Sequence, residues 1–535
     1  MAYPYREMPD LQSEPATPSL EQAPEHSQNH TEVFAVHGAD PEVLAYAMAR
    51  YSRSALSMKE SLKEISSQRA EQFLNTFYFQ YGHRSIADLA HIAFAIERLS
   101  LLAAIVLVDE QRWDGQERST RYQNFRKSGW YLPTFGPDSE SQARYTASIE
   151  DSFAAYHQVA GGMLEALCGQ IPCPEEMKPE TYTRTLRARA FDVARYLLPL
   201  ATNTSLGQIV NARTLETQIS RLLSHAAPEV QNLGERLREA AASPAWCVNR
   251  DDMAALLQRI TEADPELTDE SRELLLHETR PAPTLVKYAT PSFYQQETRR
   301  ELRQAAEEIM GQTPIADAPL VDLVEKSESL EAEIAATLLY AHSHYPYRQL
   351  RDAMASLGQA RCEEIVALGM RHRGRHDELL REFSAGQSLR FDILMDIGGF
   401  RDMHRHRRCT QILQEFTSLH GYAEPEGLTN ELAQVYRQAL DAAHALYAEL
   451  AASPIAETAA AAPYVLPLGT RTRALFKMDF AEALYISELR STPQGHFSYR
   501  RVAWEMYLAV QRRHPALAEH FRVHDPDGPI DLLKR

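Results

Sequence analysis

Apolar residues recur at helical spacing over much of this chain, and stretches that alternate in the manner of a strand are few. The longest helical pattern runs from Ile86 to Val108 and predicts one apolar helix, with core positions at Leu89, Ile92, Ala93, Ile96 and Leu99. An Asp-Pro pair at 40–41 can begin a helix that continues to about residue 53. Further helices are predicted over residues 66–80, 163–168, 214–242 and 497–512.

Two short stretches have the character of strands. Glu32–Val36 alternates apolar and polar residues and predicts a first strand, and Tyr464–Pro467 is strand-like. A second helical run is expected from Val321 onward. Between the two runs, residues 244–319 are punctuated by prolines and mixed in charge. This predicts a connection that is partly helical and most loop-like at 280–283.

The order of these features repeats along the chain. Each half contains helices, a charged motif, more helices, a Tyr-x-Leu-Pro turn and a last long helix. The period is roughly 270 residues, which indicates a tandem pair of domains and not a solenoid. We predict a disordered tail rich in Pro, Glu, Ser and Gln over 1–30, a first domain over 31–245, a connecting segment over 246–319 and a second domain over 320–535.

Composition narrows the classes of function. The chain has 535 residues and a formal net charge of −17. So acidic a protein is a poor general binder of nucleic acid or of an anionic membrane, and an anionic ligand needs a local basic site. No stretch reaches the roughly 20 apolar residues of a membrane span, and the N-terminus lacks the apolar core of a signal peptide.

The cysteines and histidines add two expectations. The five cysteines form no C-x-x-C pair, which indicates free thiols in a reducing compartment, and we expect the protein in the cytoplasm. His404 and His406 stand two residues apart without a carboxylate placed as a further ligand. We therefore expect no metal site.

Charged motifs in the first half surround the predicted long helix. Gly82-His83-Arg84-Ser85 precedes it, where Ser85 can simply cap the helix or His83 can lie beside a ligand at the positive helix end. After it come Asp109-Glu110-Gln111, and then Glu117-Arg118-Ser119-Thr120-Arg121-Tyr122.

The second half carries the densest positive patch in this acidic chain. Its centre is Arg405-His406-Arg407, close to Arg401 and Arg408. The patch can be a solvated face that pairs with the surplus carboxylates, or a cradle for phosphate oxygens, which guanidinium groups bind in bidentate fashion. Farther along the chain stands a Leu-Arg pair that ends at Arg490.

Together these motifs resemble the signature of the flavin-dependent thymidylate synthases. In that family Gly-His-x-Ser opens a helix, Arg-His-Arg follows it, and Ser-x-Arg-Tyr stands seven residues further on. Residues 192–199 and 211–215 also resemble the family's Glu-x-Ala-Arg-x-x-Leu-Pro and Asn-x-Arg-Ser-Leu. Neither half has the whole signature, because Asp109-Glu110-Gln111 replaces Arg-His-Arg in the first half and Glu415 replaces the downstream Ser in the second.

The resemblance implies an α+β fold of two tandem thymidylate-synthase-complementing-protein-like domains, each a small antiparallel sheet packed with long helices. It implies reductive methylation of dUMP to dTMP, with FAD as cofactor and with methylene-tetrahydrofolate and NADPH as co-substrates. Since the family is homotetrameric with sites between subunits, the fused chain is expected to form a homodimer that is a pseudo-tetramer.

The losses in the two halves are partly complementary, which suggests one composite site between them. The resemblance implies these roles: Arg490 and Ser119 catalytic; His83, Ser85, Arg405, His406, Arg407 and Asn211 binding FAD; Glu117, Ser119, Arg121 and Arg195 binding the nucleotide. Two alternatives stay open. The altered Ser position, together with Gly495 and His496 where the family has Ala and Gln after its Leu-Arg pair, favours a diverged flavoenzyme for another pyrimidine nucleotide. The acids at 109–110 also favour a non-catalytic nucleotide-binding or scaffold descendant.

Overall fold

The computed structural model describes residues 38–50, 58–64, 84–122, 125, 129–327, 329–374 and 377–534. The chain divides into two compact units, Met1–Ala39 and Asp40–Arg535, and every described helix and strand lies in the second. The predicted tail, the strand at 32–36 and the helix at 66–80 lie outside the described residues. Within these ranges, no helix is long and apolar enough to span a membrane. No group of three metal-ligating side chains occurs there either.

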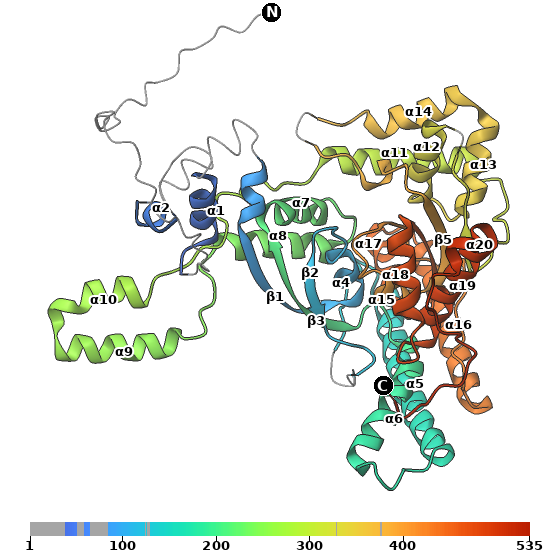
Figure 1. The fold of residues 1–535 in the computed structure, drawn as a ribbon, viewed down its shortest axis with the longest axis horizontal. Helices are drawn as coiled ribbons and strands as arrows, with labels where there is room; N and C mark the ends of the chain where they lie inside the picture. Colours follow the sequence, from blue (N-terminus) through green and yellow to red (C-terminus); the bar gives the residue numbers. More distant parts are fainter. Residues whose placement is uncertain are drawn as a thin grey trace, which may run out of the picture. The chain divides into compact units, whose positions relative to one another are not determined.

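The first half is built on a three-stranded antiparallel sheet in the order β1–β3–β2 (Figure 1). Its strands are β1 (His91–Ser100), β2 (Asp114–Glu117) and β3 (Asn203–Asn211). Its helices are α1 (Pro41–Arg50), α2 (Met58–Glu64), η2 (Arg84–Leu89), α4 (Leu101–Leu107), α5 (Ser139–Gln170), α6 (Pro179–Ala194), η3 (Arg195–Leu197), α7 (Ala212–Leu223) and α8 (Pro228–Ala242).

Several predicted helices of this half are confirmed with changed bounds. The helix expected from the Asp-Pro pair is α1, and the one expected at 163–168 is the end of the much longer α5. The region 214–242 holds two helices and not one run, because Pro228 stands at the first position of α8. Proline lacks the N–H that a continuing helix would need at that point.

The single helix predicted over 86–108 is wrong. The segment is a 3₁₀ turn, the strand β1 and the short helix α4. Ile92, Phe94 and Ile96 are β-branched or aromatic at every second position, and β1 pairs with β3 along its length. The helix begins only at Leu101, because the Ser100 side chain accepts a hydrogen bond from the Ala103 N–H and caps it.

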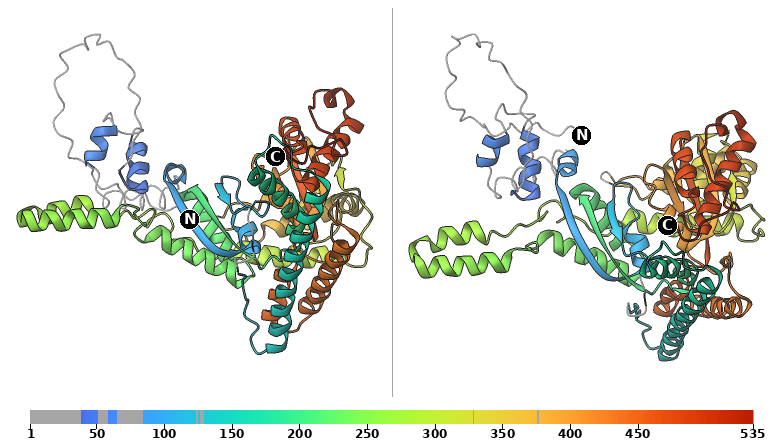
Figure 2. Two further views of the ribbon diagram at one scale, coloured as in Figure 1. Left: turned by 90° about the horizontal axis from the view of Figure 1, so that it is seen from below. Right: turned by 60° about the horizontal axis from the view of Figure 1, so that its bottom comes forward.

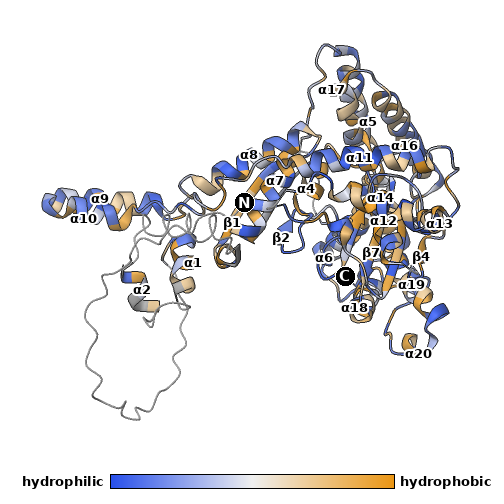
Figure 3. Cartoon of the chain, turned by 90° about the horizontal axis from the view of Figure 1, so that it is seen from above, coloured by the Kyte–Doolittle hydropathy of each residue, from blue (hydrophilic) through white to orange (hydrophobic). Residues whose placement is uncertain are grey.

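The segment 246–319 is partly helical. It contains α9 (Arg250–Ala263), η4 (Pro265–Leu267), α10 (Thr268–Leu275) and α11 (Phe293–Met310), with residues 280–283 outside any helix. The α9–α10 hairpin projects from the rest of the unit in both views of Figure 2 and is largely hydrophilic in Figure 3. Helix α11 instead packs into the second half, where Leu302 and Tyr294 are fully buried.

The second half carries a four-stranded antiparallel sheet in the order β4–β5–β7–β6. Its strands are β4 (Val321–Leu323), β5 (Leu389–Asp396), β6 (Thr410–Leu413) and β7 (Arg471–Met478). Its helices are α12 (Leu330–Tyr340), α13 (Tyr347–Leu357), α14 (Gln359–Met370), η5 (Arg381–Phe383), α15 (Ile397–Met403), α16 (Asn430–Ala451), α17 (Ala456–Ala461), η6 (Ala462–Val465), α18 (Phe480–Ser491), α19 (Phe497–Arg513) and α20 (Pro515–Ala518).

Two expectations for this half need correction and one is confirmed. The run from Val321 opens with strand β4, and its first helix begins at Leu330, where Ser329 supplies the cap. The strand-like stretch 464–467 is not a strand, because Pro463 falls in the 3₁₀ turn η6 that leads into it. The helix predicted at 497–512 is α19.

The equivalent Tyr-x-Leu-Pro turns of the two halves pair with each other. Pro199 and Pro467 form an antiparallel bridge, and backbone hydrogen bonds of 2.9 Å flank it, such as the one from the Leu200 N–H to the Leu466 carbonyl oxygen. Buried residues of both halves form one continuous hydrophobic core around this contact. The structure therefore confirms the α+β fold with two small antiparallel sheets and long helices.

The second-half sheet is buried on both faces. One face joins the shared core, and the other packs under α12 with charged side chains between them. Asp392 accepts hydrogen bonds from the Tyr340 hydroxyl and the Tyr347 N–H, and it forms an ion pair of 3.0 Å with Arg473. Next to it, Glu333 pairs with Arg390 and Lys477.

Candidate functional site

The charged motifs of the two halves occupy the same structural position. Helix α4 is capped by Ser100 and helix α15 by Asp396, and each follows the first long strand of its half. Asp109–Gln111 comes directly after α4, and Arg405–Arg407 directly after α15. One position is therefore acidic and its equivalent is basic.

These two segments face each other across the boundary between the halves. Both line one small cleft, together with Arg381. Arg381 forms an ion pair with the Asp109 carboxylate and donates a hydrogen bond of 2.8 Å to its backbone carbonyl oxygen. The His404 Nε2 atom lies 3.5 Å from the same carboxylate. Asp109 of the first half thus acts as a counter-ion of Arg381 in the second half.

Burial and charge shift the pKa values of these groups in opposite senses. Burial raises the pKa of Asp109, but the combined effect of Arg381 and His404 is to lower it. The lowering is larger, so the pKa of Asp109 lies well below its usual value. Burial lowers the pKa of Arg407 to about 10. The Arg407 guanidinium lies 5.2 Å from the centre of the Trp113 ring, which gives it a cation–π contact in place of a carboxylate partner.

His406 is held neutral beside Arg490. Burial, with Arg490 and Arg407 nearby, lowers the pKa of His406 to about 3. The Arg490 Nε–H donates a hydrogen bond of 2.8 Å to the His406 Nε2 atom. An uncharged imidazole can accept this bond, so His406 fixes the direction of the Arg490 side chain. The Glu482 carboxylate lies 3.6 Å from the other ring nitrogen of His406.

Arg121 of the first half inserts into the second half at Tyr499. Its guanidinium forms a buried ion pair of 2.7 Å with Asp192 and donates a hydrogen bond of 2.9 Å to the Tyr499 hydroxyl. It also donates to the backbone carbonyl oxygen of Gln494. Arg490 stands over the same Tyr499 ring, with its guanidinium 5.4 Å from the ring centre. Two arginines predicted to act in one site, one from each half, therefore share a single aromatic neighbour.

Arg195 is almost completely buried and only partly paired. Its side chain is 2% exposed and forms one ion pair of 3.1 Å, from Nη1 to Asp402. Its Nε and Nη2 atoms are buried and have no hydrogen-bond partner in the part of the chain that the structure describes. An unsatisfied buried guanidinium is costly, because no hydrogen bonds offset the desolvation of its N–H groups.

Glu117 and Ser119 are held within the same network. Glu117 forms an ion pair with Arg401 of the second half. The half-buried Ser119 hydroxyl accepts a hydrogen bond of 3.2 Å from the Arg121 N–H, which fixes the turn between them. The predicted nucleotide loop thus contacts the second half through Glu117 and Arg121 and is stiffened by Ser119.

The other predicted residues lie elsewhere. Asn211 caps α7, since its side chain accepts a hydrogen bond of 2.8 Å from the Thr214 N–H. Arg405 is exposed. His83 lies outside the described residues, and Ser85 lies in η2.

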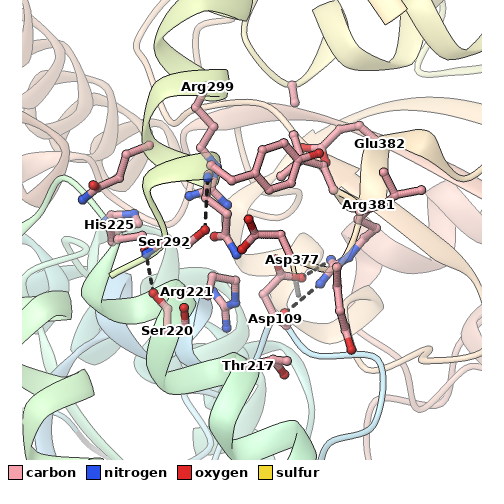
Figure 4. Close-up of a pocket in the computed structure, with 18 of the residues that line it drawn as sticks. Asp109, Thr217, Ser220, Arg221, His225, Ser292, Arg299, Asp377, Arg381 and Glu382 are labelled. Carbon is pink, nitrogen blue, oxygen red and sulfur yellow. Dashed lines mark hydrogen bonds and ion pairs between the residues drawn. The ribbon is translucent and has the colours of Figure 1, made fainter. Parts of the chain in front are cut away.

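The sequence did not indicate the large cavity of the molecule. A cavity of about 1880 Å³ opens between α7, the start of α11 and the segment 372–384 (Figure 4). Figure 4 shows Arg221, Arg299 and Arg381 reaching toward it from three separate segments. The available signal was the row of arginines at 299, 300 and 303 in the connecting segment, which puts positive charge on one side of a helix.

A family model described as "Thymidylate synthase complementing protein" matches residues 34–245 and 320–516 of the chain. The two stretches cover well over half of the sequence, and the segment that contains α9, α10 and α11 lies between them.

Similar proteins span the whole chain or one part of it. A UPF0159 protein of Chlamydia pneumoniae is 27% identical over 543 residues, which is 94% of this chain and 93% of that protein. A flavin-dependent thymidylate synthase of Clostridium tetani is 25% identical over 200 residues, or 37% of this chain and 76% of that protein. The solved Helicobacter pylori flavin-dependent thymidylate synthase, in complex with FAD and dUMP, is 17% identical with a TM-score of 0.25. That alignment covers 38% of this chain and 89% of the other.

Proposed function

Because the chain belongs to the thymidylate synthase complementing protein family, we propose that it converts dUMP to dTMP by flavin-dependent reductive methylation. The carbon comes from methylene-tetrahydrofolate, and NADPH supplies the electrons through FAD. The site is a composite of the domains at 31–245 and 320–535. The protein works in the cytoplasm as a homodimer that is equivalent to a tetramer of single domains.

The observation that carries this proposal is the meeting of Arg121 and Arg490 at Tyr499. Each arginine comes from a different half, and each belongs to a motif that only its own half retains. A site drawn from both halves explains why neither half needs the complete signature. The composite also includes the pairs of Glu117 with Arg401 and of Arg195 with Asp402.

The residues present are suited to an anionic nucleotide and a flavin. Arg195 has two buried guanidinium nitrogens without a partner among the described residues, and burial disfavours the charge of Arg407. Both features would be relieved by phosphate or carbonyl oxygens. Arg407 and the neutral His406 would hold FAD, and Arg121 with Arg195 would hold dUMP.

The protein's part in the chemistry is orientation and electrostatics. FAD, once bound and reduced by NADPH, would supply the hydride that the methyl group requires. Arg490, held in direction by His406, would stabilise negative charge that develops on the uracil ring. Ser119 keeps the loop in the form that presents Arg121, and the shared core excludes water from around it.

A second candidate function is a non-catalytic nucleotide-binding or scaffold role. The observation in its favour is that the key arginines already have carboxylate partners, Asp192 for Arg121 and Asp402 for Arg195. Ligand binding then has to compete with these internal ion pairs. A flavoenzyme that acts on another pyrimidine nucleotide lies between these two candidates, because it keeps the flavin chemistry but not the substrate dUMP.

The absorbance spectrum of the purified protein, with and without added FAD and dUMP, tests the proposal. We expect bound flavin whose spectrum changes when dUMP is added, followed by turnover with methylene-tetrahydrofolate. Rescue of a thymidine-requiring host would separate thymidylate synthesis from activity on another nucleotide. A protein that takes up no FAD would contradict both flavoenzyme candidates and leave the binding or scaffold role.

A further inference from the structure

Helix α11 brings positive charge to the large cavity from outside the family-matched segments. It spans Phe293–Met310, between the matched stretches 34–245 and 320–516. Its Arg299, Arg300 and Arg303 line the cavity all the same. This wall of the cavity therefore lies outside the matched family segments.

Arg299 is the arginine of this wall that lacks a counter-ion. Arg300 forms an ion pair of 2.9 Å with Glu297, and Arg303 pairs with Glu415. Across the cavity, Arg221 pairs with Glu110 at 2.7 Å, and Arg381 pairs with Asp109. Arg299 forms no ion pair or hydrogen bond with any residue that the structure describes, so its charge is available to a ligand.

No nearby acid forms a direct ion pair with Arg299 among the described residues. Glu382 and Asp109 act on its charge favourably from a distance, and Arg221 and Arg381 act unfavourably. Burial lowers the pKa of Arg299, and this is the largest influence on it. A cation in such surroundings gains from an oxyanion in direct contact.

Two histidines line the same cavity as Arg299, His225 from the first half and His342 from the second. Burial lowers the pKa of His225 to about 4 and that of His342 to about 3, with Arg299 contributing to both, so both rings are neutral near pH 7. The His225 Nδ1 atom accepts a hydrogen bond of 3.0 Å from the Ala227 N–H. The proton of a neutral ring must then be on Nε2, which can donate. Both ring nitrogens of His342 lie buried without a partner in the described chain.

We propose that Arg299, His225 and His342 form a binding subsite for an oxyanion, either a phosphate or a carboxylate group of a small-molecule ligand that occupies the cavity. The guanidinium provides charge and two parallel donors, and the imidazoles provide neutral donors from opposite halves. A ligand bound there bridges the first domain, the connecting segment and the second domain. The volume of about 1880 Å³ exceeds the roughly 300–1,000 Å³ of an ordinary ligand site, which leaves room for this subsite beside another ligand.

Direct titration of the full-length protein with inorganic phosphate, and separately with glutarate, tests the subsite by calorimetry at low salt. We expect at least one of the two to bind, and Arg299→Gln to weaken it by about ten- to a hundredfold. The matched control is Arg300→Gln, one residue along the same helix, where the side chain is 58% exposed and paired with Glu297. We expect this control to change affinity by less than about twofold.

The outcomes separate the ligand classes. Binding of phosphate alone indicates a phosphorylated ligand, binding of glutarate alone indicates a carboxylate ligand, and binding of both indicates a general oxyanion site. Binding of neither overturns the proposal. An Arg299→Gln protein that binds as well as wild type also overturns it, as does an equal loss in Arg300→Gln.

A charge-retaining variant covers the case in which Arg299→Gln does not fold. Arg299→Lys keeps the positive charge but loses the bidentate fork, and we expect about three- to tenfold weaker binding. If Arg299→Lys bound the oxyanion as tightly as wild type, the proposed bidentate contact of the guanidinium would be contradicted. Because phosphate and glutarate titrations need neither flavin nor nucleotide, failure here leaves the spectral test of the proposed function untouched, and failure of that test leaves this one valid.

Discussion

At one equivalent position the two halves carry opposite charges. Directly after the capped helix α4 stand Asp109 and Glu110, and directly after α15 stand Arg405 and Arg407. In a symmetric pair the same motif would meet itself, and like charges would repel across the interface. Here the acidic copy pairs with Arg381 and lies beside His404 of the other half. Duplication has allowed one copy to become the counter-ion of the region that the other copy keeps basic.

The two sheets also differ in charge and burial at equivalent positions. Asp392 of β5 pairs with Leu475, four residues before the cap Asp479, and Ala95 of β1 pairs with Gly207, four residues before the cap Asn211. Asp392 is fully buried in a charged network under α12, whereas Ala95 is exposed. In the second half this sheet face is an ionic core, and at the equivalent position of the first half it carries a small, exposed residue. Equivalent backbones therefore tolerate different chemistry where one face changes from buried to exposed.

The largest effect is expected from Asp392→Ala. The change leaves Arg473 buried without its 3.0 Å partner, and we expect a loss of about 3–5 kcal/mol in the free energy of unfolding. Ala95→Ser, at the equivalent exposed position, should change it by less than about 0.5 kcal/mol. Urea unfolding followed by circular dichroism measures both. Equal losses would contradict the assigned difference between the two sheet faces.

Arg490→Lys tests the retained basic side of the comparison. Lysine cannot reproduce the Nε–H donor to His406, so the charge that we propose to stabilise the uracil ring is no longer held in direction. We expect kcat/KM for dUMP to fall by about a hundredfold, or about 2.7 kcal/mol, with little change in stability. Arg408→Gln is the control, because that side chain is 63% exposed and outside the site. An equal fall of kcat/KM in Arg408→Gln would show that the loss does not depend on the position of Arg490 and would contradict the assigned role.

Asp109→Asn tests the acidic side. Removing this charge takes the partner from Arg381, and since the carboxylate is 35% exposed and partly screened we expect a loss of about 1–2 kcal/mol at pH 7. The folded pKa of Asp109 lies below its usual 3.8, so its contribution is present above that pH and is lost as the pH falls through the lower folded value. The difference in the free energy of unfolding between wild type and variant should therefore shrink progressively as the pH falls below about 4. A difference in the free energy of unfolding that stays constant down to pH 2 would contradict the role of the ionised Asp109 carboxylate.

The smallest stability effect is expected from Arg407→Gln. Burial disfavours the charge of this residue, and its described contact is the Trp113 ring, so stability should change by less than about 1 kcal/mol. FAD affinity should still fall by about tenfold, because a cation placed for an anionic ligand is lost. Fluorescence titration with FAD and thermal unfolding on one sample measure the two quantities. A large loss of stability with unchanged FAD affinity would assign Arg407 a structural role.

Sequence patterns identified what depends on local residues and missed what depends on distant partners. The end helix α19 could be predicted because it rests on a local periodicity. The expectation that the Arg121 and Arg490 motifs meet comes from the resemblance to a family with sites between subunits. Strand β1 was misjudged as helix because its apolar residues satisfy both periods, and its partner β3 lies about a hundred residues away. The cavity at Arg299 could not be found, because it exists only where α11, α7 of the first half and the segment 372–384 of the second half come together in the fold.

A double-mutant cycle tests most directly whether the two halves share one nucleotide site. The measured quantity is the Kd of dUMP, followed through the flavin spectrum, for wild type, Arg121→Lys, Arg490→Lys and the double variant. Because both side chains contact Tyr499, we expect the two changes to be coupled by about 1 kcal/mol or more. Additivity to within about 0.3 kcal/mol would show that the two arginines act in separate places and would contradict the composite site.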